Sequence, residues 1–127
     1  MLAEIKRARQ IPGEGFRRWF TDEYFDLIVW YEDAKHPTAP RGFQLCYDKN
    51  GRERALTWTR EHGFQHNRVD SGEIPGHSKM SPVIVADGEF SGDVVSERFR
   101  REAAAIDRTL ADFVYSTVRA YRRRART

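Results

Sequence analysis

The sequence predicts an α+β protein: an antiparallel, curved β-meander of four to six strands packed against one long C-terminal helix. Three observations lead to this prediction. Aromatic and β-branched runs, separated by turn residues, fill residues 16–90. An Asn-Gly pair joins two of these runs, which is a strong short-range signal for a hairpin. Apolar residues recur at spacings of three and four through 93–124, as in an amphipathic helix.

The chain has 127 residues, the size of one domain, and we expect 1–127 to form a single domain. In it, 1–15 is an N-terminal segment, 16–90 the sheet, and 93–124 the helix with its basic end. No apolar run reaches the roughly 20 residues that span a bilayer. The N-terminus has no signal-peptide pattern, and one cysteine cannot form an internal disulfide. These features favour a cytoplasmic protein that makes no membrane contact.

The first elements are predicted from apolar spacing. Leu2, Ile5 and Ala8 have the spacing of a short helix, and a strand is expected over 16–20. The run EYFDLIVWYE (23–32) is apolar on both faces, which is typical of a central strand covered on both sides. Its first face holds Phe25, Leu27, Val29 and Tyr31. Its second face holds Tyr24, Ile28 and Trp30, together with Asp26.

The stretch GFQLCYDKNGRERALTW (42–58) predicts a hairpin and its register. A type I′ turn centred on Asn50 and Gly51 needs positive φ at both residues, which this pair tolerates. A slip of one residue would move every apolar side chain to the wrong face, so turn and pattern agree on one register. The predicted pairs are Phe43 with Trp58, Leu45 with Leu56, Tyr47 with Arg54, Gln44 with Thr57 and Cys46 with Ala55.

The next strand, near 64–69, has two possible registers. A two-residue turn at His62–Gly63 would pair Leu56 with Val69. A three-residue turn would instead place Phe64, His66 and Arg68 beside Leu56 and Trp58. A long polar loop (70–82) and a short apolar strand (83–86) follow.

The last third predicts one continuous helix. Asp93 or Ser96 could cap its N-terminus, and the arginines at its other end complement the helix dipole. A helix of about 28 residues would be some 40 Å long, enough to cross a sheet. We expect its apolar stripe to lie on the sheet face of Phe43, Leu45, Leu56 and Trp58. The stripe consists of Val95, Phe99, Ala103, Ile106, Leu110, Phe113, Thr117 and Tyr121.

Charge is distributed unevenly along the chain. Residues 19–96 hold eight Lys/Arg and thirteen Asp/Glu, whereas residues 97–127 hold nine and four. The basic ends are compatible with an anionic polymer as partner, or with a structural role in holding the acidic sheet. Nucleic acid is the less favoured partner, because an acidic sheet repels phosphates and no phosphate-cradling or RNA-binding motif is present.

Candidate chemical groups are few. A nucleophilic Cys46 would need a base beside it, and the register supplies none, so packing is the favoured role. His62, His66, Asp70 and His77 form the densest run of potential metal ligands. On a strand, however, residues four apart lie about 13 Å apart, too far for one metal ion. The sequence therefore predicts no metal site, no catalytic group and no cofactor.

The favoured function is a non-catalytic binding or regulatory module that uses the second sheet face and the 70–82 loop. A small ligand, a protein partner or a second copy of the chain would cover that face, since exposed apolar patches mark interaction sites. The alternatives are a small histidine-dependent, metal-assisted enzyme and a binder of anionic polymers through the basic termini. The expected ligand- or partner-binding residues are Tyr24, Ile28, Trp30, His66, Asp70, His77 and Lys79.

Overall fold

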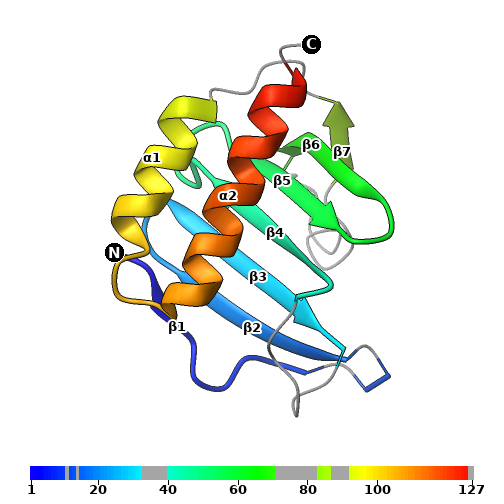
Figure 1. The fold of residues 1–127 in the computed structure, drawn as a ribbon, viewed down its shortest axis with the longest axis vertical. Helices are drawn as coiled ribbons and strands as arrows, with labels where there is room; N and C mark the ends of the chain where they lie inside the picture. Colours follow the sequence, from blue (N-terminus) through cyan, green and yellow to red (C-terminus); the bar gives the residue numbers. More distant parts are fainter. Residues whose placement is uncertain (11, 14, 33–39, 71–82, 87–91, 126–127) are drawn as a thin grey trace.

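The computed structural model confirms an α+β fold built on an antiparallel meander (Figure 1). It describes residues 1–127 apart from 11, 14, 33–39, 71–82, 87–91 and 126–127, and apart from the side chains of 69–70, 83–86, 92–93 and 122–125. In the described part of the chain, seven strands lie in sequence order in one sheet, and two helices cover one of its faces. The strands are β1 (Ala3–Glu4), β2 (Phe16–Thr21), β3 (Phe25–Tyr31), β4 (Gly42–Tyr47), β5 (Arg54–Thr59), β6 (Gly63–Asp70) and β7 (Val83–Ala86).

The predicted register of the β4–β5 hairpin is confirmed, but the predicted turn is wrong. Phe43 lies opposite Trp58, as expected. The turn begins at Asp48, which has a φ of 58° and whose carbonyl accepts a hydrogen bond from the Gly51 amide at 3.1 Å. Neither Asn50 nor Gly51 has a positive φ. The Asn50 side chain instead donates to the Glu23 carbonyl at 3.1 Å. This turn therefore contacts the β2–β3 turn and does not have the type I′ geometry.

Of the two registers left open for the next strand, the structure has the one with the three-residue turn. Leu56 pairs with His66, and Trp58 pairs with Phe64. Gly63 follows the turn with a φ of 71°, a left-handed conformation that glycine adopts without steric cost. This register directs His66 toward the helices.

The single long helix is a wrong prediction, because the structure has two: α1 (Gly92–Glu102) and α2 (Arg108–Ala125). Asp107 caps α2, since its Oδ1 accepts the amides of Thr109 at 3.0 Å and Leu110 at 3.3 Å. The helices lie side by side over one sheet face (Figure 1). Among the described residues, neither is long and apolar enough to cross a membrane.

The predicted short N-terminal helix is also wrong, because Ala3 and Glu4 form β1 and pair with β2. Arg18 on β2 holds Glu4 through two hydrogen bonds of 2.8 and 2.9 Å, and this pairing raises the pKa of Arg18. Leu2 is buried, and its amide donates to the Glu102 carbonyl at 2.8 Å. The N-terminal segment therefore joins the sheet to the end of α1.

The core lies between the helices and the predicted first face of the sheet. Alternate residues of β3 are fully buried there, as the sequence pattern predicts. The apolar stripe divides between the two helices, so that each contributes part of it. The main buried side chains are Leu2, Phe20, Phe25, Leu27, Val29, Tyr31, Phe43, Leu45, Leu56, Val95, Phe99, Ala103, Leu110, Val114 and Val118.

Candidate functional site

The second face of the sheet is turned away from both helices, and it carries two of the predicted binding residues. Ile28 and Trp30 of β3 lie there, both half-buried. Trp19 of β2 lies opposite Ile28, and Gln44 of β4 lies on its other side. The prediction that Ile28 and Trp30 lie on the same face of the sheet is therefore confirmed.

Tyr24 does not share that face, contrary to the sequence pattern. It precedes β3 and packs against the core, with its ring 4.8 Å from the ring of Phe25 in an edge-on arrangement. The guanidinium of Arg98, on α1, lies 3.6 Å from the centre of the Tyr24 ring. Burial raises the pKa of the Tyr24 hydroxyl. A turn, rather than a continued strand, places the tyrosine on the helix side.

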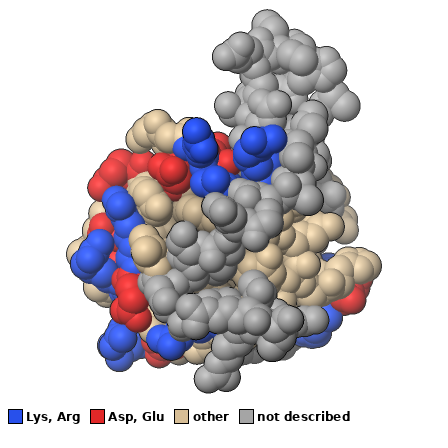
Figure 2. Space-filling view, turned by 90° about the horizontal axis from the view of Figure 1, so that it is seen from above, with Lys and Arg blue, Asp and Glu red and all other residues tan. Residues whose placement is uncertain are grey.

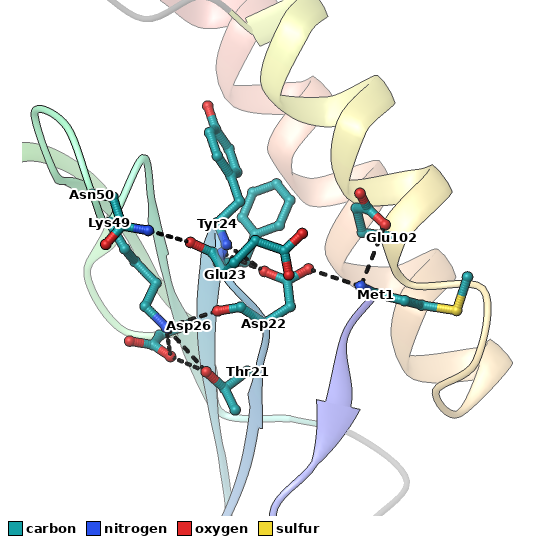
Figure 3. Close-up of polar contacts among 10 residues, drawn as sticks. Met1, Thr21, Asp22, Glu23, Tyr24, Asp26, Lys49, Asn50 and Glu102 are labelled. Atoms are coloured by element: carbon teal, nitrogen blue, oxygen red, sulfur yellow. Dashed lines mark hydrogen bonds and ion pairs between the residues drawn. The ribbon is translucent and has the colours of Figure 1, made fainter.

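The turn that holds Tyr24 belongs to a polar network at one end of the sheet (Figure 3). The Asp22 side chain is only 2% exposed, and its Oδ1 accepts the amides of Tyr24 at 2.8 Å and Phe25 at 2.6 Å. Lys49 Nζ donates to the Asp22 carbonyl at 2.8 Å and to Asp26 Oδ1 at 3.0 Å. These groups bind one another, so the network has a structural role. We call this network, formed by Asp22, Asp26 and Lys49, the clamp.

His66 lies on the helix-covered face, and so it cannot share a surface with Trp30. Its side chain is 7% exposed, and its Nε2 is 2.7 Å from the Tyr47 hydroxyl. Its ring stacks on that of Tyr47 and lies 5.9 Å from that of Tyr121 on α2. His66 is therefore part of the core between sheet and helices.

The remaining predicted positions fall at or beyond the limit of the described chain. Asp70 ends β6, where its backbone pairs with Val83. His77, Lys79 and the predicted 70–82 loop beyond Asp70 lie outside the described residues, so their roles stay predictions. Within the described chain, no three His, Cys, Asp or Glu side chains converge as metal ligands.

Cys46 lies on the second face between Asp26 and Ala55. Burial raises the pKa of its thiol to about 12, and the negative charges of Glu53 and Asp26 act in the same direction. The thiol is therefore protonated at neutral pH, and a protonated thiol is a poor nucleophile. This environment suits the packing role that the sequence indicates.

A hollow of about 440 Å³ opens on the second face at the end of β3, beside Trp30. This volume lies in the range of small-molecule sites. The hollow is bordered by the start of β4 and by the turn between β5 and β6. The described residues that line it are Trp30, Glu32, Arg41, Gly42, Thr59, Arg60, Glu61 and His62.

The floor of the hollow is a glycine. Gly42 pairs with Trp30 on one side and with Thr59 on the other, so these three residues form a row across three strands. A Cβ at Gly42 would lie 2.5 Å from the Trp58 carbonyl oxygen, which excludes any other residue without a backbone shift. Two strand spacings, about 10 Å, separate the backbone of Trp30 from that of Thr59. The Thr59 side chain leans toward the glycine, because its Cγ2 would lie 3.0 Å from a Cβ at Gly42.

The rim of the hollow is charged, and its charges are unequally paired. Arg41 Nε lies 3.4 Å from a carboxylate oxygen of Glu32, and its Nη2 lies 3.5 Å from a carboxylate oxygen of Glu61. Arg60 Nη2 donates to the Pro40 carbonyl at 3.2 Å. Among the described residues, Arg41 therefore has two carboxylate partners, whereas Arg60 has a neutral carbonyl and no carboxylate.

Backbone hydrogen bonds hold these arginines at the rim. The Arg41 amide donates to the Trp30 carbonyl at 2.7 Å, and the Arg60 amide donates to the Arg41 carbonyl at 2.8 Å. The His62 amide donates to Thr59 Oγ1 at 3.0 Å, which shapes the turn after Arg60. The sequence pattern predicts Trp30 as a binding residue, but it does not predict the two arginines or Gly42. The hairpin register, which pairs Gly42 with Thr59, was the one available signal.

Away from the hollow, the described surface carries charges of both signs (Figure 2). Figure 2 shows basic and acidic side chains interspersed over the described surface seen from above. The side chains of residues 122–125, in the basic C-terminal end, are not among those that the structure describes. No protein-family model matches the chain, and comparisons with curated proteins and with solved structures find no similar protein. The geometry of the hollow is therefore the basis for a functional proposal.

Proposed function

We propose that this protein is a non-catalytic binding module that holds a small ligand on the second face of its sheet, in the hollow beside Trp30. The observation that carries the proposal is the hollow of about 440 Å³ itself, which has the volume of a small-molecule site and has Trp30 in its lining. A half-buried tryptophan at the edge of such a hollow supplies a large apolar surface to a ligand.

The chemistry around the hollow favours binding over catalysis. Its carboxylates, Glu32 and Glu61, are held by Arg41. His62 is 81% exposed, and its Nε2 lies 3.8 Å from Glu61 Oε2, which is itself exposed. Among the described residues, no buried carboxylate pairs with this histidine to orient it for proton transfer, as general acid–base catalysis requires. The expected contribution of the 70–82 loop stays a prediction.

A ligand-detected NMR screen of a fragment library tests the proposal, with the indole N–H signals of the protein as the second readout. We expect fragments that bind to shift the Trp30 signal and to lose binding in Trp30→Ala. Trp19→Phe is the matched control, because Trp19 lies on the same face and should leave binding unchanged. Fragment binding that survives Trp30→Ala, or hits confined to the helix-covered face, would show that the function lies elsewhere.

A further inference from the structure

We propose that the hollow selects a planar aromatic carboxylate, with its ring on the indole of Trp30 and its carboxylate on the guanidinium of Arg60. This inference rests on the proposed function, and it names the class of ligand. It follows from the shape of the hollow and from the pairing of the charges around it.

The hollow leaves room for a ring beside the indole of Trp30. The cross-strand neighbour of Trp30 on β4 is Gly42, so no side chain from β4 competes for contact with the indole at this position. A planar ring can therefore stack on the indole from within the hollow. A saturated ring is thicker and lacks a π-face, so it fits and stacks less well.

The charge pattern favours an anion over a cation. Both rim carboxylates lie within 3.5 Å of Arg41, so a cationic ligand would have to compete with an arginine for them. Arg60 is the lining arginine whose described partner is a carbonyl oxygen rather than a carboxylate. A ligand carboxylate would complete its pairing, and the planar guanidinium can hold both carboxylate oxygens.

Arg60 is also positioned for this role. Its backbone amide donates a hydrogen bond to the Arg41 carbonyl, and its guanidinium donates through Nη2 to the Pro40 carbonyl. Arg60 and Trp30 both line the hollow. A ring on Trp30 that carries a carboxylate directly or through one carbon can therefore bring that group toward Arg60.

The test compares three probes by ligand-detected NMR titration at low salt, where charge effects are largest, with the Trp30 indole signal as a second readout in every variant that keeps Trp30. The probes are 1-naphthoate, 1-naphthylmethylamine and cyclohexanecarboxylate. We expect 1-naphthoate to bind most tightly. Arg60→Gln should weaken it on the order of tenfold, the effect of losing a charge-assisted pair. Arg108→Gln is the matched control: Arg108 is an exposed arginine on α2, 90% exposed and paired with Asp112, and its loss should change nothing.

Three outcomes would overturn the inference, and they bear differently on the proposed function. Equal binding of the amine and the carboxylate, with Arg60→Gln neutral and Trp30→Ala disruptive, rejects the anion but leaves a ligand site at Trp30. Binding of 1-naphthoate that Trp30→Ala does not weaken rejects both proposals. An Arg60→Gln effect of equal size on the amine rejects the anion in the same way, because the amine has no carboxylate for Arg60 to hold.

Discussion

The polar side chains at the two ends of the sheet differ in burial and in how closely they are paired. At one end, the β2–β3 turn and the 48–53 loop meet, and their polar side chains bond to each other and to backbone (Figure 3). Lys49 and Asp26 are each 25% exposed and 3.0 Å apart. At the other end, the Arg41 ion pairs are longer, at 3.4 and 3.5 Å, and both of its glutamate partners are 67% exposed.

This difference separates a structural site from a binding site within one meander. A polar group that is buried and saturated contributes to stability, and removing one partner leaves the other unsatisfied. An exposed ion pair contributes little to stability. The clamp end should therefore control folding, whereas the hollow end, apart from its glycine floor, should tolerate substitution and control binding.

Gly42→Ala should have the largest effect, because the floor of the hollow is dictated by backbone packing. The added Cβ would lie 2.5 Å from the Trp58 carbonyl oxygen and 3.0 Å from Thr59 Cα, and neither backbone atom can rotate away. We expect the free energy of unfolding to fall by about 3 kcal/mol, as measured by urea denaturation.

Gly51→Ala is the matched control for this substitution. Its Cβ would meet the Asp48 carboxylate at 2.6 Å, and that group is a side chain that can move. We expect a loss below about 1 kcal/mol. Equal losses for the two variants would mean that the close approach of β4 and β5 does not require the glycine.

Asp22→Ala should have the next largest effect, since it removes the centre of the clamp. The carboxylate accepts two backbone amides in a 2% exposed position, and without it both amides lose their partner. We expect a loss of about 2 kcal/mol in the free energy of unfolding. Asp22→Asn keeps an accepting oxygen and should lose less than half as much.

The comparison between these two variants tests the origin of the effect. Asp22 Oδ2 has no hydrogen-bond partner among the described residues, and its ionic neighbour, the Met1 nitrogen, lies 3.7 Å away. If Asp22→Asn were as destabilising as Asp22→Ala, the negative charge rather than the amide bonds would hold this end together.

The sequence predicted the strands well because each depends on a pattern within a few residues. All six expected strands are present, and the hairpin register survived a wrong turn because apolar alternation fixed it independently of Asn50 and Gly51. The sequence left two registers open for the strand after β5. The structure has the one with the three-residue turn, which is followed by Gly63 in the left-handed conformation.

The features that sequence analysis missed depend on contacts between distant segments. Glu102, at the end of α1, accepts a bond from the Leu2 amide, a hundred positions away in the chain. The break before α2 carried one local signal, the capping residue Asp107, which the unbroken apolar spacing obscured. Arg41 and Arg60 meet Trp30 only through the β3–β4 register, and no turn motif encodes that register across a ten-residue connection.

The smallest predicted effect measures the two ends directly, by double-mutant cycles on their ion pairs. For Lys49 and Asp26, the cycle of Lys49→Met and Asp26→Asn should give a coupling energy of about 1 kcal/mol, because the pair is partly buried and Lys49 also bonds the Asp22 carbonyl. For Arg41 and Glu32, the cycle of Arg41→Gln and Glu32→Gln should give about 0.3 kcal/mol or less, since salt and water screen an exposed pair.

Raising the salt to 0.5 M should reduce the coupling energy of Arg41 and Glu32 proportionally more than that of Lys49 and Asp26. A larger coupling at Arg41 than at Lys49 would contradict the division into a clamp end and a binding end, because it would make the rim of the hollow part of what holds the fold.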